Sequence, residues 1–320
     1  MGVDVANIQE LAERVVERVE RVLVGKPLAV QLSLTAMLSH GHLLIEDNPG
    51  TGKTSLARAL AQSIRGTTTR VQFTPDLLPS DVTGVTIYDQ SNHTFEFHRG
   101  PVFASIVLAD EINRASPKTQ SALLEVMEES RVTVDGHPHE VGRPFLVIAT
   151  QNPIEQAGTY KLPEAQLDRF MIKTSIGYPS LAIAERILAG AVDRNPSAAL
   201  QPVITTRAVA DMADLAASVH VDPAVARYAA QLVEATRAST STRLGVSVRG
   251  AISMMRMARV VAASQGRHYV IPDDVKALAA PVWTHRLVLD PEAEFAGTTS
   301  ESVIERALAA VEAPLARASA

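Results

Sequence analysis

The sequence contains no cysteine among its 320 residues. Disulfide bonds, thiolate nucleophiles and zinc–thiolate sites are therefore excluded. Aromatic residues are also scarce, at 4% against 46% hydrophobic residues, so aliphatic side chains must fill most of the core. A chain of this length and hydrophobic content can form two domains or one large domain.

Two further absences concern membranes and nucleic acids. No apolar run approaches the roughly 18 residues that a membrane-spanning helix needs, and the charged N-terminus does not resemble a signal peptide. We therefore expect a soluble, cytoplasmic protein. There is also no surplus of positive charge. The formal net charge of −5 disfavours a protein that coats nucleic acid, although it leaves room for a local basic groove.

A glycine-containing segment at residues 47–54 lies between a predicted strand and a predicted helix. The apolar run at 43–45 has the length of a buried strand, and residues 55–64 have the composition and apolar spacing of a helix. A strand, a glycine loop and a helix N-terminus form an anion site, because backbone N–H groups converge there and the helix dipole adds partial positive charge. We interpret the segment as a phosphate loop.

Individual residues of this loop have separate predicted tasks. Gly50 and Gly52 allow a tight turn and a close approach of phosphate oxygens. Lys53 is expected to bridge the β- and γ-phosphates, and the Thr54 hydroxyl to bind Mg²⁺. Asp47 occupies the first glycine position of the usual G-x-x-x-x-G-K-[ST] pattern. The alternative to a phosphate loop is a helix-capping turn with an incidental lysine, which the strand–loop–helix context disfavours. The loop residues expected to bind the nucleotide are Asn48, Pro49, Gly50, Thr51, Gly52, Lys53, Thr54 and Ser55.

Two adjacent carboxylates, Asp110 and Glu111, end a second buried strand at residues 106–109. Such a pair is costly unless a cation or a polar substrate lies beside it. With a phosphate loop on a neighbouring strand, we expect Asp110 to hold Mg²⁺, often through water, and Glu111 to polarise the attacking water. The alternative is a helix-capping aspartate with a solvated glutamate. It is disfavoured because both motifs end strands on the rim where α/β proteins bind ligands.

Further strands and two hairpins are predicted around these motifs. Strand patterns cover residues 67–73 and 145–149. Hairpin patterns cover residues 84–98 and 131–141, and the second contains a tight Asp-Gly turn. The hairpins offer apolar, histidine and acidic side chains, so they form a mixed surface instead of a basic groove.

Two polar residues have an open interpretation from the residues alone. Asn152 follows a buried strand and is a candidate for orienting water or contacting a γ-phosphate, but a turn begun by Asn152 and Pro153 explains it equally well. Arg249 lies in the first turn of a helix that Ser247 caps. A cation there opposes the helix dipole by roughly 0.3–1 kcal/mol, so Arg249 either faces solvent or faces a phosphate.

From about residue 180 the sequence changes to alanine-rich helices without strand signals. Helix starts are predicted at Pro223, Ser247 and Pro272. Just before this region, Glu164 and Asp168 place like charges four residues apart on a short helix, which is locally unfavourable and hints at a contact between subunits.

Taken together, these motifs resemble the MoxR-type AAA+ ATPases. The resemblance covers essentially the whole chain and is carried by the runs DNPGTGKT, LADEINRASPKTQSALLEVMEE, IATQNP, LPEAQLDRF and SVRGAISMMRMARVVAASQGR. In that family the first glycine of the phosphate loop is commonly absent, so Asp47 does not count against the assignment.

The resemblance implies an α/β fold in which a five-stranded parallel sheet with hairpin insertions is followed by an all-α lid. The nucleotide-binding domain would cover residues 1–190, including an amphipathic helix that the apolar spacing predicts over 7–23, and the lid 191–320. The family also implies a ring, usually hexameric, that hydrolyses ATP with Mg²⁺ and acts in the maturation of protein complexes. Its partners often carry a von Willebrand factor A domain.

For individual residues, the resemblance implies the roles already given for the phosphate loop and the two carboxylates. It further implies that Asn152 is the first sensor and that Arg249 is the second sensor, on the lid. Arg169 would be the arginine finger that reaches the γ-phosphate of the neighbouring subunit.

Other functions fit the sequence less well. A GTPase needs an N-K-x-D run to recognise guanine, and this sequence has none. A small-molecule kinase would need a substrate cleft of its own and would not need an arginine from a neighbouring subunit. A ring motor acting on nucleic acid shares the hairpin insertions, but the net charge and the lack of a basic, aromatic-interleaved stretch disfavour it. An ATP-switched scaffold with little turnover stays open, although Glu111 argues against it.

Overall fold

The structure, a computed structural model, describes residues 5–152, 159–189 and 200–314, and the chain divides into two units. The first, called the core unit, comprises Arg14–Leu162 and Thr174–Ala210; the second, called the lid unit, comprises Met1–Glu13, Pro163–Lys173 and Asp211–Ala320. The predicted domain boundary at 190/191 falls outside the described residues and stays a prediction.

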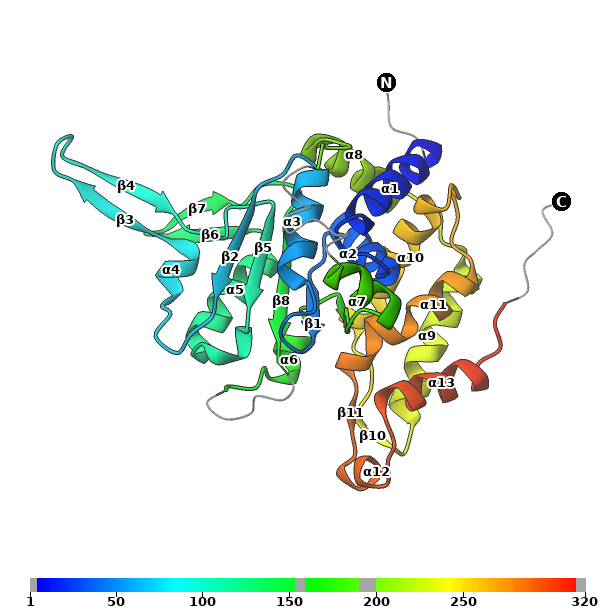
Figure 1. The fold of residues 1–320 in the computed structure, drawn as a ribbon. Coiled ribbons are helices and arrows are strands. Elements are labelled where there is room, and N and C mark those ends of the chain that lie inside the picture. The colour runs from blue at the N-terminus through cyan, green and yellow to red at the C-terminus, as the bar shows by residue number, and fades with distance from the viewer. Residues whose placement is uncertain (1–4, 153–158, 190–199, 315–320) are drawn as a thin grey trace. The chain divides into compact units, whose positions relative to one another are not determined.

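A five-stranded sheet with the strand order β2-β5-β8-β1-β9 is the central feature of the fold (Figure 1). Its strands are β1 (Leu43–Glu46), β2 (Thr68–Gln72), β5 (Ile106–Asp110), β8 (Leu146–Gln151) and β9 (Ile172–Thr174). The pairs β2–β5, β5–β8 and β8–β1 are parallel, which confirms the predicted sheet. Although β1 comes first in the chain, it lies between β8 and β9. Its carboxyl end is therefore at a switch in strand order, where open α/β sheets bind ligands.

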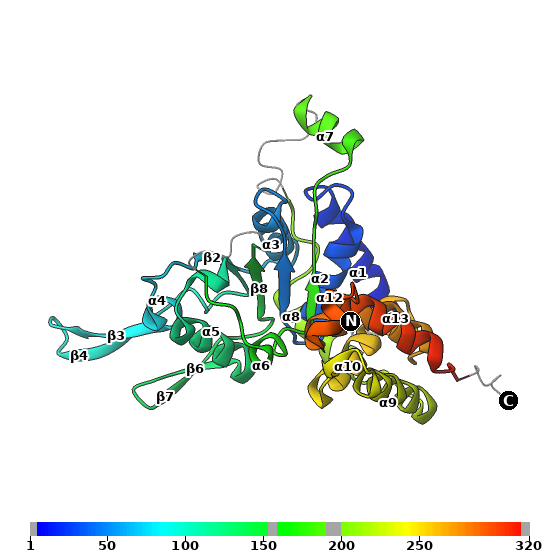
Figure 2. The ribbon, with the colours of Figure 1, turned by 90° about the horizontal axis from the view of Figure 1, so that it is seen from below.

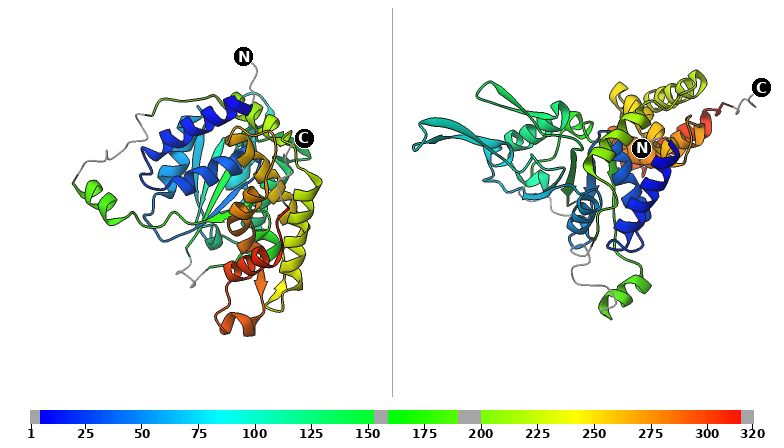
Figure 3. Two further views of the ribbon diagram at one scale, coloured as in Figure 1. Left: turned by 90° about the vertical axis from the view of Figure 1, so that its right-hand side faces the viewer. Right: turned by 90° about the horizontal axis from the view of Figure 1, so that it is seen from above.

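Helices precede, connect and follow these strands in the chain. They are α1 (Val5–Glu20), α2 (Pro27–Leu38), α3 (Lys53–Ser63), α4 (Pro79–Thr83), α5 (Pro117–Glu129), α6 (Glu164–Leu167) and α7 (Leu181–Leu188), with a 3₁₀ turn at Ile112–Arg114. α1 was predicted over 7–23 and ends three residues earlier, where the chain turns toward Gly25, which has a φ of 74°. α4 is a short helix of five residues that follows β2. α7 stands away from the sheet in both views of Figure 3.

Both predicted hairpins are confirmed. β3 (Gly84–Asp89) pairs with β4 (Thr94–Arg99), and β6 (Arg131–Val134) pairs with β7 (His137–Glu140), both antiparallel. The two hairpins project on the same side of the core unit (Figures 1 and 2). They also touch, because the rings of Phe97 and His139 stack with their centroids 4.1 Å apart.

The lid unit is helical, as predicted. Its helices after residue 200 are α8 (Thr206–Ala217, which begins in the core unit), α9 (Pro223–Ala238), α10 (Val248–Ser264), α11 (Pro272–Trp283), α12 (Pro291–Phe295) and α13 (Ser300–Ala310), with a 3₁₀ turn at Thr284–Arg286. The predicted starts are confirmed: Ser247 caps α10 through the Gly250 N–H at 3.0 Å, and Pro272 opens α11. One short antiparallel pair, β10 (Thr242–Leu244) with β11 (Val288–Leu289), was missed because strands of two or three residues carry no pattern.

The described part of the chain holds no helix that is both long and apolar enough to cross a membrane.

One buried histidine ties the sheet to its helices in the core unit. The Nδ1 atom of His42 accepts the N–H of Val147 at 3.0 Å, and its Nε2 lies 3.0 Å from the Met127 carbonyl oxygen. Because Nδ1 accepts, the ring is neutral and Nε2 is the donor. Burial lowers the pKa of His42 from 6.5 to about 4.

This lowered pKa predicts a loss of stability in mild acid. Between pH 6.5 and 4 the unfolded state binds the proton and the folded state does not, so the contribution of His42 is complete above pH 6.5 and falls toward pH 4. Relative to His42→Gln, the wild-type advantage in the free energy of unfolding should shrink by about 2–3 kcal/mol between pH 7 and pH 4.5. Urea titrations at both pH values measure it. The exposed His98→Gln is the matched control, and an advantage that does not change with pH would contradict the prediction.

Candidate functional site

A cavity of about 380 Å³ lies in the core unit, where the phosphate loop and the carboxyl ends of β5 and β8 meet. Most of the predicted nucleotide-site residues of this unit line it. The lining residues are Pro49, Gly50, Gly52, Lys53, Thr54, Ser55, Arg70, Asp110, Glu111, Thr150, Gln151 and Asn152. The structure thus brings together motifs separated by about a hundred residues in sequence. Asn48 and Thr51 belong to the same loop, and the Thr51 hydroxyl donates to the Asn48 carbonyl at 3.3 Å.

Both loop glycines have backbone conformations that favour glycine. Gly50 has a φ of 83° and Gly52 a φ of 99°. A Cβ on Gly52 would lie 2.8 Å from a methyl of Leu23, whereas a Cβ on Gly50 would meet nothing within 4 Å. The chain then enters α3 at Lys53, so the unpaired N–H groups of a helix start lie at the cavity. This is the geometry that phosphate oxygens require.

Asp47, at the position of the missing glycine, has a structural task of its own. It is not among the residues with positive φ, so its conformation does not require glycine. Its buried carboxylate accepts the N–H groups of Ile176 and Gly177 at 2.6 and 2.8 Å. Its carbonyl oxygen, with that of Asn48, accepts from Lys53 Nζ at 2.8 and 3.0 Å. Asp47 therefore joins the loop to the segment that follows β9.

One hydroxyl connects the two carboxylate residues at the end of β5. Thr150 Oγ1, on β8, donates to Asp110 Oδ1 at 2.6 Å and accepts the Glu111 N–H at 2.9 Å. The other oxygen of Asp110 accepts from the Arg70 guanidinium at 2.6 Å, on β2. The two adjacent carboxylates were expected to need a cation beside them. The Arg70 guanidinium supplies part of that positive charge.

Glu111 stands at a strained point of the backbone. Its φ of 56° and ψ of 50° are left-handed, which costs a residue with a side chain roughly 1–2 kcal/mol. The turn takes the chain out of β5 and leaves the Glu111 side chain at the cavity, where Oε2 accepts from Gln72 at 2.8 Å and Arg114 at 3.1 Å. Strain of this kind gathers at functional positions.

Three residues of the site were not predicted from the sequence, namely Arg70, Gln72 and Thr150. Arg70 and Gln72 alternate along β2, so they share one face, and Gln72 lies opposite Asp110 in the register of β2 with β5. The alternation was visible in the sequence, but the neighbouring strand and its register were not. Thr150 was visible only as the residue after a buried strand.

The donors at the cavity suit Mg²⁺. Thr54, Asp110 and Glu111 present hydroxyl and carboxylate oxygens, and Mg²⁺ prefers oxygen ligands and keeps several waters. Among the described residues, no group of three or more His, Asp or Glu side chains could hold a metal ion. One of the hairpin histidines, His139, has its ring stacked on that of Phe97.

The predictions for four other residues differ in what the structure shows of them. Asn152 lines the cavity, and the alternative turn depends on Pro153, which lies outside the described residues. Arg169 and Arg249 belong to the lid unit, and their roles at the nucleotide stay predictions. The suggested task of Asp168 between subunits stays a prediction; within the chain its carboxylate is bound by Arg286 at 2.7 Å and by Ser247 at 2.9 Å.

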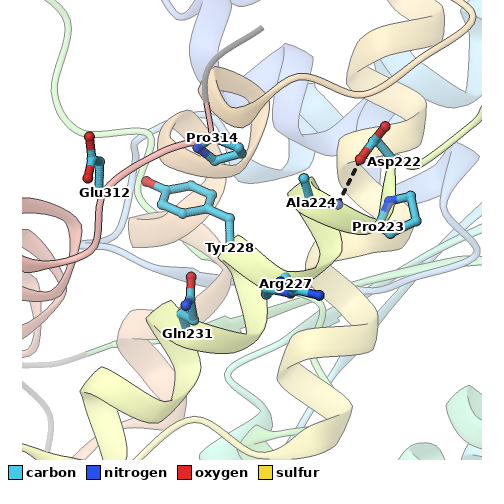
Figure 4. A pocket seen from close by; sticks show the side chains of 8 residues that line it. All are labelled: Asp222, Pro223, Ala224, Arg227, Tyr228, Gln231, Glu312 and Pro314. Carbon is cyan, nitrogen blue, oxygen red and sulfur yellow. Dashed lines mark hydrogen bonds between the residues drawn. The ribbon is translucent and has the colours of Figure 1, made fainter. Parts of the chain in front are cut away.

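Another cavity, of about 420 Å³, lies in the lid unit (Figure 4). It is formed by the start of α9, where the Asp222 carboxylate accepts the Ala224 N–H at 2.7 Å, and by the chain at Glu312 and Pro314. This cap confirms the predicted helix start at Pro223. None of the predicted site residues lines the cavity, so the rim of the sheet is the candidate site.

Comparison with known proteins shows the family of the chain. The ATPase family associated with various cellular activities (AAA) matches residues 42–172, and the AAA lid domain matches residues 234–307. A crystal structure of a Cytophaga hutchinsonii protein superposes with a TM-score of 0.90 at 36% identity and covers 97% of each chain.

Relatives match along most of the chain. The chain is 41% identical to Chaperone MoxR1 of Mycobacterium tuberculosis, over 94% of this chain and 82% of that protein. It is 34% identical to Protein MoxR of Paracoccus denitrificans, over 85% and 87%, and 48% identical to YeaC of Bacillus subtilis, over 97% of each.

The position of the Thr150 hydroxyl predicts that Thr150→Val is destabilising. Valine keeps the shape but leaves the Glu111 N–H and an oxygen of Asp110 without this partner, which should cost about 1–3 kcal/mol of unfolding free energy. Chemical denaturation measures it, with Thr150→Ser, which retains the hydroxyl, as the control. Equal stability of the valine and serine variants would show that the hydroxyl does not organise the two carboxylates.

Proposed function

The chain belongs to the MoxR-type AAA+ ATPases, and on that basis we propose that it couples Mg-ATP hydrolysis to chaperone-like remodelling or maturation of partner protein complexes. One observation carries the proposal. The glycine loop, the carboxylates of Asp110 and Glu111, and Asn152 all line one cavity of the core unit. Each part alone has an ordinary structural explanation, but their convergence at the switch in strand order is what a phosphate-hydrolysing site needs.

The chain's own groups divide the work of hydrolysis. The loop N–H groups and Lys53 bind the phosphates of ATP, for which Lys53 exchanges the carbonyls of Asp47 and Asn48 for phosphate oxygens. Thr54 and Asp110 would hold Mg²⁺, which would supply positive charge beside the phosphate oxygens. Glu111 polarises the attacking water, and Asn152 orients it from the next strand.

Two arginines of the lid unit have proposed roles in hydrolysis. We propose that Arg169 reaches the γ-phosphate bound to a neighbouring subunit, so that the active form is a ring, and we propose a hexamer from the family. Arg249 is proposed as the second sensor. Because ATP hydrolysis builds negative charge on the transferred phosphoryl group, an arginine supplied there is worth about 10³–10⁵ in rate.

Protein clients suit the two hairpins better than nucleic acid. Phe95 is 74% exposed and Tyr88 45% exposed, and acidic residues such as Asp89 and Glu96 lie on the same ribbon. A mixed apolar and acidic surface lacks the dense positive track that supplies most non-specific affinity for nucleic acid. A partner with a von Willebrand factor A domain is proposed from the family, and we place the reaction in the cytoplasm, where ATP and Mg²⁺ are supplied.

The division of work predicts two distinct defects. Lys53→Ala should weaken ATP binding, because it removes the charge that holds the β- and γ-phosphates. Glu111→Gln should bind ATP normally but hydrolyse it poorly, because only water activation is lost. ATP-analogue titration and steady-state turnover measure both properties. Equal loss of ATP binding in the two variants would contradict the separate roles.

A further inference from the structure

The backbone on both sides of Arg169 is held by one buried guanidinium. Arg286 Nη2 donates to the carbonyl oxygens of Asp168 and Phe170, at 3.2 and 2.7 Å. Its Nη1 donates to the carbonyl oxygen of Met171 at 3.2 Å. Its Nε donates to the Asp168 carboxylate at 2.7 Å. The Arg286 side chain is 1% exposed. All of these residues belong to the lid unit.

The same carboxylate also binds the start of α10, the helix that carries Arg249. Ser247 Oγ donates to Asp168 Oδ2 at 2.9 Å and accepts the Gly250 N–H at 3.0 Å, which makes it the cap of this helix. Arg286 packs directly against the first turn, because a Cβ on Gly250 would lie 2.8 Å from Arg286 Cδ. Gly250 is therefore required for close packing and not for an unusual φ.

Stability alone does not account for this arrangement. Burying a guanidinium costs several kcal/mol, and buried ion pairs often contribute no more than well-packed apolar residues would. What the fork of Arg286 adds is geometry, since its several donors each fix one acceptor in a set direction. Most of the acceptors that Arg286 fixes lie within residues 168–171. The others are the carbonyl oxygen of Val282, four residues before Arg286, and the Ser253 hydroxyl at the longer distance of 3.4 Å.

We propose that Arg286, through Asp168 and Ser247, is a positioning residue that holds Arg169 and the first turn of α10 as one rigid element. This inference rests on the proposed roles of Arg169 and Arg249 at the nucleotide. Neither Arg286 nor Asp168 contacts ATP in this account. They set the direction from which the two arginines approach it, so that a loosened clamp leaves ATP binding intact and misaligns the transition state.

The test uses Asp168→Asn in the full chain. Asparagine keeps the size but loses the charge that orients Arg286 Nε and Ser247. ATP affinity should stay within about threefold, and turnover should fall by about 10–100-fold, as small misplacements of catalytic groups do. In an Arg169→Ala background the same substitution should lower turnover by a clearly smaller factor than it does in the wild type, because the part of its effect that acts through Arg169 is already lost and only the part through α10 remains.

A matched control separates positioning from stability. Asp274 pairs with Arg267 at 2.6 Å in the lid unit, where its side chain is 4% exposed against 20% for that of Asp168. Among the described contacts it has no hydrogen bond to residues 168–171. Asp274→Asn should lower the melting temperature about as much as Asp168→Asn does, yet leave turnover unchanged. If Asp168→Asn does not fold, Ser247→Ala and its hydroxyl-retaining partner Ser247→Thr make the same comparison, with loss expected only for alanine.

The outcomes distinguish this inference from the proposed function. If Arg169→Ala greatly reduces turnover while Asp168→Asn and Ser247→Ala behave like Asp274→Asn, the positioning role is overturned and the arginine finger stands. If Arg169→Ala leaves turnover unchanged, the finger role and the inference that rests on it both fail. A turnover defect in Asp168→Asn that persists in full in the Arg169→Ala background would also overturn positioning through Arg169.

Discussion

A buried carboxylate needs partners, and Asp110 imposes this requirement on the whole rim of the sheet. Arg70 from β2 and Thr150 from β8 meet it from the two strands that flank β5. Thr150 also accepts the Glu111 N–H, so pairing Asp110 fixes the residue that follows it as well. Because the sheet is parallel, these side chains lie at the same edge as the phosphate loop. The candidate site is thus a consequence of strand order as much as of its motifs.

Local patterns predicted the parts of the site that local physics determines. The phosphate loop, the two carboxylates and both hairpins follow from glycine positions, apolar runs and turn signals within a few residues. The partners of Asp110 and Asp168 could not be predicted, because Arg70 and Arg286 lie 40 and 118 residues away along the chain. For the same reason, the like charges of Glu164 and Asp168 gave no hint that Asp168 has partners within the lid unit, Arg286 and Ser247. Asp47 was recognised as a departure from the pattern, but its task depends on Ile176 and Gly177.

The two units use the same device for different ends. In the core unit an arginine pairs with a carboxylate next to the proposed water-activating residue, Glu111. In the lid unit an arginine pairs with a carboxylate next to the proposed arginine finger, Arg169. Each pair costs desolvation and returns orientation, which is the usual reason for ordering polar groups around a catalytic centre. In the proposed mechanism, the core unit binds ATP and activates water, and the lid unit presents the arginines.

In the proposed ring, the core unit of one subunit and Arg169 of another form each active site. Mixing Arg169→Ala subunits with Lys53→Ala subunits tests it most directly, because each variant lacks a different half. Neither should hydrolyse ATP alone, and randomly assembled mixtures should recover activity that peaks near equal amounts, where about a quarter of the interfaces hold both intact halves. No recovery at any ratio, with co-assembly of the two variants shown independently, would contradict a shared site.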